Sequence, residues 1–408
     1  MEIKYIENGS VTSAKGFTAN GICAGVKASN TTKKDLALIY CDKVCNSAAI
    51  FTKNLVKSDT IYVTKKHLEN GTAQAVVVNS GNANACNPDG YEKAEKMCSL
   101  AADALGVDEN DVIVASTGVI GQPLPIEPIA SGIEKLKGTL SKDGGISAAE
   151  AIMTTDTVSK QVACTVNIAG KEVTVGGMCK GAGMIHPHMA TMLCFITTDA
   201  VIEKKALQKM TSDIVEDSFN MISVDGDTST NDTVLVLANG EAGNDTIKEG
   251  SSDYDTFYEA LSYVLTELSK KIAGDGEGCT CLFEVQVKGA STKEQARILA
   301  KSIVTSNLTK AAIFGHDANW GRILCALGYA GVDFDPVKVD ISLKSADGVI
   351  EIVKDGIATD YSEDEATKVL SADAVTVDID VHNGVFEATA WGCDLTHDYV
   401  TINADYRS

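Results

Sequence analysis

The strongest constraint on the fold is that two different hydrophobic periods alternate along the chain. Residues 337–343 and 375–381 alternate apolar and polar side chains, which is typical of strands with one buried face. Between residues 257 and 272, by contrast, apolar side chains recur every three or four positions, as on the buried face of a helix. The chain therefore combines sheets with helices that can cover them.

Further short segments predict strands. Residues 76–78 and 112–114 are apolar runs, and residues 165–168 and 173–175 flank Ala169-Gly170-Lys171 as the two arms of a hairpin. Hairpins mixed with helices favour antiparallel or mixed sheets over a strict βαβ series. We therefore expect an α/β (α+β) fold, a layered α/β sandwich with mixed sheets.

Turn and capping residues mark the ends of these elements. Ser291-Thr292-Lys293-Glu294 has the pattern of a capping box that opens a helix through Ile303. Asn383-Gly384 predicts a turn after the strand that ends near residue 381. Three segments rich in glycine and small residues predict tight, ordered turns: residues 79–84, 176–183 and 274–278.

Composition limits the partners that the protein can have. The 408 residues include 35 Lys plus Arg against 56 Asp plus Glu, for a formal net charge of −21. A chain this acidic is repelled by nucleic-acid phosphates and by anionic membranes. No run reaches the roughly 18 to 20 apolar residues of a membrane span, and the first residues lack the apolar core of a signal peptide. We expect a cytoplasmic, globular protein that binds neither nucleic acid nor membrane.

The sequence does not favour a metal site or a redox pair. The twelve cysteines include no CxxC pair, so free buried thiols are expected. His186-Pro187-His188, with Cys179 upstream, lacks a further clustered ligand. Asp225, Asp227 and Asp232 form an acidic cluster, but the Ser and Thr residues among them suit side-chain to backbone hydrogen bonds. We therefore predict no metal.

The glycine-rich segments do not match nucleotide-binding loops. A P-loop requires GxxxxGK[ST], whereas Lys180 is followed by Gly181. Residues 274–278 have the wrong spacing for a Rossmann fingerprint and carry two carboxylates where a pyrophosphate would bind. The residues therefore give no support to a nucleotide cofactor.

The Ala190-Thr191 dipeptide suggests a different chemistry. A threonine hydroxyl needs a neighbouring base to act as a nucleophile, and an N-terminal threonine supplies one in its own amine, whose reference pKa is about 7.7–8.0. This requires cleavage of the peptide bond before Thr191. An Ala-Thr pair in an ordinary buried strand would look the same, so the residues alone leave both interpretations open.

The residues around this bond form a longer pattern. Lys180-Gly181-Ala182-Gly183-Met184-Ile185 is followed by Pro187 and by Met189-Ala190-Thr191-Met192-Leu193. This pattern resembles the self-processing signature of the ornithine acetyltransferase family, the glutamate N-acetyltransferases of the cyclic arginine pathway. A departure is His316, where we expect arginine, and the chain ends in Ser408, where threonine or serine is usual. Further segments resemble the family in matching order: residues 79–86, 116–121, 153–156, 225–232, 274–278, 319–322 and 403–406.

The resemblance implies a self-cleaving acetyltransferase. Cleavage between Ala190 and Thr191 would give an α chain, residues 1–190, and a β chain, residues 191–408, which would associate as an α2β2 heterotetramer. Thr191 would then take the acetyl group of N2-acetylornithine and pass it to glutamate in a ping-pong reaction. The implied fold is a two-lobed architecture resembling the N-terminal-nucleophile hydrolases.

The resemblance also implies roles for individual residues. Thr117 and Gly118 would stabilise the oxyanion of the tetrahedral intermediate. We expect Lys180 to bind an amino-acid carboxylate and Glu277 the side-chain ammonium of ornithine, although glutamate then brings a carboxylate to the same pocket. The implied substrate contacts are Thr154, Lys180, Thr191, Glu277, Asn403 and Ser408.

Two questions stay open at this point, the class of reaction and the range of acetyl donors. An amidohydrolase or aminopeptidase could use the same residues with water as the acceptor, and a binding or scaffold protein would remain uncleaved. Acetyl-CoA could serve as a second acetyl donor, and no residue separates a bifunctional enzyme from one that only recycles acetyl groups. Finally, we interpret Trp320 and Arg322 as anchors of a helix rather than as substrate contacts.

Overall fold

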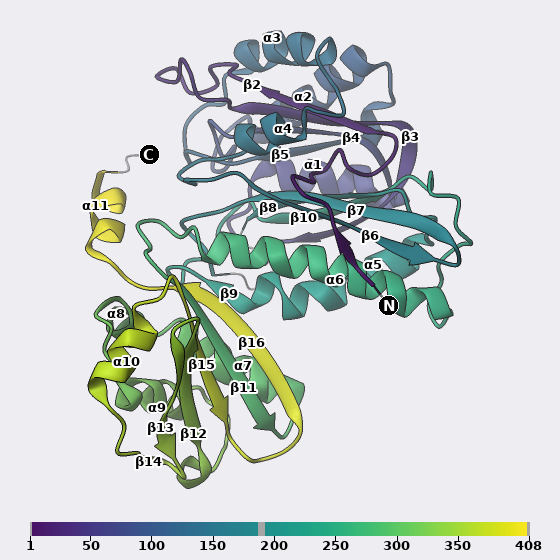
Figure 1. Ribbon diagram of the computed structural model, residues 1–408. Coiled ribbons are helices and arrows are strands. Elements are labelled where there is room, and N and C mark those ends of the chain that lie inside the picture. The colour runs from purple at the N-terminus through teal and green to yellow at the C-terminus, as the bar shows by residue number, and fades with distance from the viewer. Residues whose placement is uncertain (1, 187–191, 406–408) are drawn as a thin grey trace.

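The computed structural model describes residues 2–186 and 192–405 and has two lobes, each built on a β-sheet covered by helices (Figure 1). The strands are β1 (Lys4–Tyr5), β2 (Phe17–Ile22), β3 (Leu36–Phe51), β4 (Thr72–Asn79), β5 (Val112–Ser116), β6 (Lys160–Ile168), β7 (Lys171–Lys180), β8 (Leu193–Thr198), β9 (Ile222–Ser223), β10 (Thr233–Ala238), β11 (Leu282–Ala290), β12 (Asp340–Ser345), β13 (Gly348–Lys354), β14 (Ile357–Ala358), β15 (Ala374–Asp380) and β16 (Phe386–Cys393). The α-helices are α1 (Asp59–His67), α2 (Gly90–Leu105), α3 (Ile126–Lys137), α4 (Gly145–Ala151), α5 (Lys204–Asp217), α6 (Ser252–Ala273), α7 (Lys293–Val304), α8 (Asn307–Phe314), α9 (Trp320–Gly328), α10 (Glu363–Leu370) and α11 (His397–Asp405). Short 3-10 helices cover Leu68–Asn70, Glu109–Asp111, Phe219–Met221 and Pro336–Lys338.

The larger lobe contains a nine-stranded mixed sheet. Its strand order is β1-β6-β7-β8-β10-β3-β4-β5, and β2 pairs with β3. Strands β8 and β10 run parallel, with Leu193 opposite Thr233, so the segments that precede both strands emerge at the same edge of the sheet. Helices α1 and α2 pack against β5, α4 packs against β2 and β3, and α6 packs against β6 and β7. The residues of β8 and β10 are buried throughout, as expected for central strands covered on both faces.

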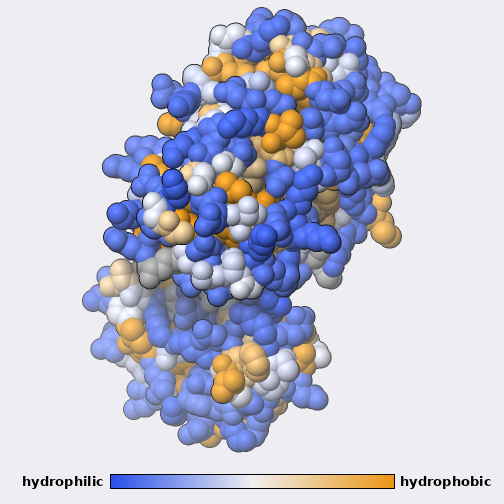
Figure 2. Space-filling model, turned by 90° about the vertical axis from the view of Figure 1, so that its right-hand side faces the viewer, coloured by the Kyte–Doolittle hydropathy of each residue, from blue (hydrophilic) through white to orange (hydrophobic). Residues whose placement is uncertain are grey.

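The smaller lobe contains a seven-stranded sheet in the order β14-β13-β12-β15-β11-β16-β9. Helix α7 packs against β11 and β16, while α10 packs against β12 and β13. Helix α6 also contacts β9 and β16, so it lies between the two sheets and joins their cores (Figure 1). Figure 2 shows that hydrophilic residues cover most of one face, with hydrophobic clusters mainly on the larger lobe.

The structure confirms the layered α/β class and most of the expected elements. The predicted helix over residues 257–272 lies within α6. The predicted hairpin is formed by β6 and β7, and Ala169 and Gly170 at its tip both have positive φ, 50° and 82°. Thr292 caps α7 by accepting a hydrogen bond from the Gln295 N–H, and the Gln295 side chain accepts one from the Ser291 N–H, so Gln295 takes the place expected for Glu294. Trp320 begins α9, and its neighbour Asn319 caps that helix.

Two local predictions are wrong. The expected strand over residues 337–343 begins only at Asp340, because Pro336 opens a 3-10 turn. Residues 176–180 belong to β7 instead of a turn. Gly177 is needed there for close packing, because a Cβ would lie 2.4 Å from the Ile196 side chain. A third prediction is confirmed: the chain turns at Asn383-Gly384, because β15 and β16 run in opposite directions on either side of β11.

The predicted division of the chain at Ala190-Thr191 lies outside the described residues. It does not follow the two lobes, because β8 and β10 come after that point and yet lie inside the larger sheet. No helix within residues 2–186 and 192–405 is long and apolar enough to cross a membrane.

Candidate active site

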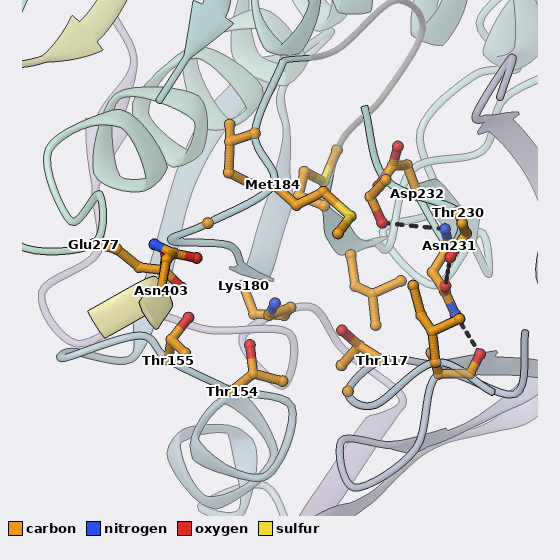
Figure 3. Close-up of a pocket in the computed structure, with 18 residues that line it drawn as sticks. Thr117, Thr154, Thr155, Lys180, Met184, Thr230, Asn231, Asp232, Glu277 and Asn403 are labelled. Atoms are coloured by element: carbon orange, nitrogen blue, oxygen red, sulfur yellow. Dashed lines mark hydrogen bonds between the residues drawn. The ribbon is translucent and has the colours of Figure 1, made fainter. Parts of the chain in front are cut away.

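Six predicted site residues from distant parts of the chain line one pocket of about 310 Å³ (Figure 3). The pocket lies between the end of β7, the turn after β5, the segment after α4, the loop after α6, and α11. Ala190, Thr191 and Ser408 lie outside the described residues, but Met192 and Leu193, which follow Thr191 directly, line the pocket. The six residues are Thr117, Gly118, Thr154, Lys180, Glu277 and Asn403.

The segment predicted to stabilise an oxyanion is held by hydrogen bonds on both sides. The Thr117 N–H donates to the Asn79 carbonyl at 3.0 Å. Gly118 has a φ of +125°, and a Cβ at this position would lie 2.8 Å from the Asn82 backbone nitrogen. The Asn231 amide donates to the carbonyls of Ala83 and Ser116, both at 2.6 Å. The turn after β5 is therefore rigid, as a site for preorganised donors must be.

A buried network of alternating charges lies beneath the pocket. The Asp156 carboxylate accepts a hydrogen bond from the Lys160 ammonium at 2.7 Å and lies 3.9 Å from the Lys180 ammonium. It also accepts from the backbone N–H groups of Gly181 and Thr154, at 2.7 and 3.0 Å. The side chains of Asp156 and Lys160 are 0% and 1% exposed, so both charges depend on each other for stabilisation. Through Asp156, this network positions the ammonium group of Lys180.

The pKa values in this network follow from burial and charge. Burial lowers the pKa of Lys180, and the repulsion of Lys160 lowers it further. The attraction of Asp156 acts in the opposite direction and raises this pKa. For Asp156, burial is outweighed by the two ammonium groups, which hold the pKa of the carboxyl well below its usual range. The buried Asp156 carboxylate therefore supports a positive charge on Lys180, which an amino-acid carboxylate can bind.

Glu277 lies at the opposite end of the pocket from Asp232 (Figure 3). Its carboxylate accepts a hydrogen bond from the Asn403 amide at 2.8 Å, and its backbone N–H donates to the Ala182 carbonyl at 2.9 Å. Gly183 allows this approach, because a Cβ there would lie 2.4 Å from the Glu277 carboxylate. A carboxylate held at this end can bind an ammonium group.

Sequence reasoning missed the contribution of residues 229–232 to the pocket. Asp232 was grouped with Asp225 and Asp227, but the structure separates them. Asp225 accepts hydrogen bonds from the backbone N–H groups of Met184 and Ile185, as the structural interpretation expects. Asp232 instead lines the pocket, and burial raises the pKa of its carboxyl well above the usual value. Its position immediately before β10, which runs parallel to β8, is the signal that could have identified it.

The pocket combines groups that can bind an amino acid with groups that can stabilise a developing charge. Lys180 and Glu277 carry opposite charges, and Thr117 and Gly118 supply a hydroxyl and a backbone N–H. A volume of about 310 Å³ suits a small molecule of amino-acid size. The arrangement therefore fits acyl transfer on a small zwitterionic substrate.

Comparison with known proteins relates almost the whole chain to one family. The model of the ArgJ family matches residues 18–408. The arginine biosynthesis bifunctional protein ArgJ of Caldanaerobacter subterraneus subsp. tengcongensis is 51% identical over 404 residues, which cover 99% of this chain and 100% of that protein. Its namesake from Symbiobacterium thermophilum is 52% identical over 401 residues, covering 98% and 99%. A crystal structure of arginine biosynthesis bifunctional protein argJ from Bacillus halodurans matches with a TM-score of 0.50 and 48% identity, covering 52% of this chain and 98% of that chain.

Proposed function

Because the chain belongs to the ArgJ family of arginine-biosynthesis enzymes, we propose that it transfers the acetyl group of N2-acetylornithine to glutamate in this pocket. The products are ornithine and N-acetylglutamate, and the enzyme is a glutamate N-acetyltransferase. The observation that carries the proposal is that six predicted residues from five separate segments meet in one pocket, which Met192 and Leu193 also line.

Self-cleavage comes first. The Thr191 hydroxyl attacks the Ala190 carbonyl carbon, the peptide C–N bond breaks, and water hydrolyses the resulting ester. The cleavage releases the Thr191 amine. One observation supports two chain pieces: the B. halodurans chain is matched over 98% of its length but spans only 52% of this chain, so it is about half as long.

Acetyl transfer then proceeds in two half-reactions. The Thr191 amine takes the proton of its own hydroxyl, which attacks the acetyl carbonyl of acetylornithine. Thr117 and Gly118 donate hydrogen bonds to the oxyanion, and a single such donor is worth about 3 to 4 kcal/mol. The C–N bond breaks, and ornithine leaves with a proton. The glutamate amine attacks the acetyl ester and restores the threonine hydroxyl.

Substrate recognition uses the opposite charges of the pocket. Lys180 binds the α-carboxylate, while Glu277, held by Asn403, binds the side-chain ammonium of ornithine. Thr154 and Ser408 complete the contacts. Asp232, whose raised pKa favours the neutral acid, adds a hydrogen-bond donor to the wall of the pocket. A neutral acid there also avoids repulsion of the carboxylates that both substrates carry.

The test combines protein chemistry with an assay of acetyl transfer. The purified enzyme is expected to run as two bands on a denaturing gel, with the second beginning at Thr191. N2-acetylornithine labelled in its acetyl group should label N-acetylglutamate when glutamate is present. Thr191→Ala should give one intact, inactive chain. Two fragments from that variant would refute the cleavage site, and release of free acetate in place of N-acetylglutamate would identify an amidohydrolase.

The name "bifunctional" of the relatives supports a second acetyl donor, which we propose is acetyl-CoA. Formation of N-acetylglutamate from acetyl-CoA and glutamate, without acetylornithine, tests it. We also propose that the two chains form an α2β2 heterotetramer in the cytoplasm. Native mass spectrometry checks the assembly, and cell fractionation checks the location.

A further inference from the structure

A second pocket adjoins the active-site pocket and is lined by lysines. It has a volume of about 290 Å³, and its lining includes Lys27, Lys33 and Lys34. Three lysines around one small pocket contrast with the net charge of −21 of the whole chain. We call this cavity the lysine pocket.

Two of the three lysines have charge to offer a ligand. Lys34 is already paired, because its ammonium lies 2.6 Å from the Glu150 carboxylate. Neither Lys27 nor Lys33 forms an ion pair within 4.0 Å with a carboxylate of the described residues. Burial lowers the pKa of Lys33, the attraction of Asp156 opposes this, and the charge of Lys180 adds to the lowering. The attraction of a bound anion would offset this lowering of the Lys33 pKa.

The one carboxylate in the lining, Asp35, is occupied by the loop that carries the lysines. It is 3% exposed and accepts hydrogen bonds from the backbone N–H groups of residues 24–26, at 2.6, 3.2 and 2.8 Å. The Asn30 amide donates to the same carboxylate at 2.9 Å. Asp35 therefore folds the loop and is largely shielded from a ligand.

The lysine pocket adjoins the active-site pocket and shares part of its lining. Gly118, Thr154 and Thr155 line both cavities. The Lys33 ammonium donates a hydrogen bond to the Thr154 carbonyl, which ties the lysine loop to this shared wall. On the other side, a Cβ on Gly81 would lie 2.9 Å from the Lys27 backbone nitrogen, so glycine lets the loop approach the segment after β4, against which Gly118 packs.

We infer that the lysine pocket binds the phosphate groups of an acyl-coenzyme A donor, while its flexible arm runs along the shared wall and places the thioester in the active-site pocket. This inference rests on the proposed function, whose nucleophile it uses. The Thr191 hydroxyl attacks the thioester carbonyl and its amine takes the proton. The C–S bond breaks, coenzyme A leaves as the thiol with that proton, and the acetyl-threonine passes its acetyl group to glutamate.

The chemistry of the pocket favours this donor over the amino-acid substrates. Acetylornithine and glutamate must place their reacting groups beside Thr191, where Lys180 and Glu277 already supply charged partners. Acyl-coenzyme A carries several phosphate charges at the end distant from the thioester. Lys27 and Lys33 line a neighbouring pocket, so they can bind phosphates while the thioester end lies in the active-site pocket.

The experiment compares two thioesters that differ in their phosphates. Using the processed full-length enzyme with glutamate, kcat/KM is measured for acetyl-CoA and for S-acetylpantetheine, which lacks the phosphates. We expect wild type to prefer acetyl-CoA by at least about tenfold. The ratio of the two constants should fall by about tenfold in Lys27→Gln/Lys33→Gln, and also fall in the single variant Lys27→Glu. The control Lys171→Gln/Lys205→Gln removes two exposed positive charges elsewhere and should keep the wild-type ratio.

Several results would overturn the inference. A wild-type ratio near one, an unchanged ratio in both lysine variants, or a rise in the KM for glutamate in place of acetyl-CoA would each do so. If wild type transfers acetyl groups from acetylornithine but neither uses acetyl-CoA nor is inhibited by coenzyme A, the inference is refuted, while the proposed transfer from acetylornithine to glutamate stands. Failure of the acetylornithine reaction itself would refute the proposed function.

Discussion

Replacing Asp156 by asparagine tests the buried network that supports Lys180. The carboxylate accepts hydrogen bonds from the Lys160 ammonium and from two backbone N–H groups, and its side chain is fully buried. Asparagine keeps one acceptor oxygen, but it removes the negative charge and turns an amide N–H₂ toward groups that are themselves donors. Lys180 then lies buried without the carboxylate that supports its charge.

The expected loss of stability can be bounded from the contacts. Removing one partner of a buried ion pair costs about 3 to 5 kcal/mol. Lys160 retains a second carboxylate, because its ammonium also lies 2.5 Å from Asp275. We therefore expect the lower end, about 3 kcal/mol in the free energy of unfolding. The KM for acetylornithine should also rise, since the pKa of Lys180 falls when Asp156 no longer supports its charge.

Urea denaturation of the processed enzyme, followed by circular dichroism, measures the stability. Asp143→Asn, which removes an exposed carboxylate, is the matched control and should change the free energy of unfolding by less than about 0.5 kcal/mol. If Asp156→Asn lost no more stability than this control, with an unchanged KM, the network would not support the site.

The stability difference between wild type and Asp156→Asn should also depend on pH. The pKa of Asp156 lies lower in the folded protein than its ordinary value of about 3.9, so its contribution to stability is fully present above that value. The contribution is lost as the pH falls below about 4 toward the folded-state pKa. The stability difference between wild type and Asp156→Asn should therefore be constant near neutral pH and shrink in acid. A difference that grew in acid would contradict the assignment.

Three further substitutions test the pocket walls. Gly183→Ala would place a Cβ against the Glu277 carboxylate and should raise the KM for acetylornithine at least about tenfold in steady-state assays. Gly138→Ala should not, because the nearest atom would lie 4.0 Å from its Cβ. Asn231→Ala removes two hydrogen bonds to the backbone beside the oxyanion segment and should lower kcat more than it raises KM, with a stability loss of about 2 kcal/mol in the same denaturation assay. Glu277→Gln should raise the KM for acetylornithine without disturbing the fold. An unchanged KM would refute the ammonium contact.

Local structure was predictable where a few neighbouring residues decide it. The periodic apolar residues of α6 and the hairpin at Ala169-Gly170 depend on local packing preferences and backbone angles, and both were found where expected. The errors have two origins, one local and one in the pairing of two strands. Pro336 interrupts an otherwise strand-like period, and Gly177 suits a strand only because the Ile196 side chain lies against it.

The pocket shows the opposite case. Motifs singled out Thr117, Lys180 and Glu277, but no local pattern states that the turn after β5, the end of β7 and the loop after α6 meet. Asp232 was missed because its role depends on the pairing of β10 with β8. Likewise, Lys27 and Lys33 form a pocket only through the folding of their loop around Asp35.

The sequence by itself therefore determined the local elements and, through its motifs, the family and the residues expected to carry out acetyl transfer. The tertiary structure decided which distant segments share a pocket, how the buried charges of Asp156 and Lys160 support Lys180, and where a second cationic cavity lies. The physical reason is the distance along the chain over which each effect acts. Backbone preferences act over a few residues, whereas burial, which sets these charges and their pKa values, results from the packing of the whole chain.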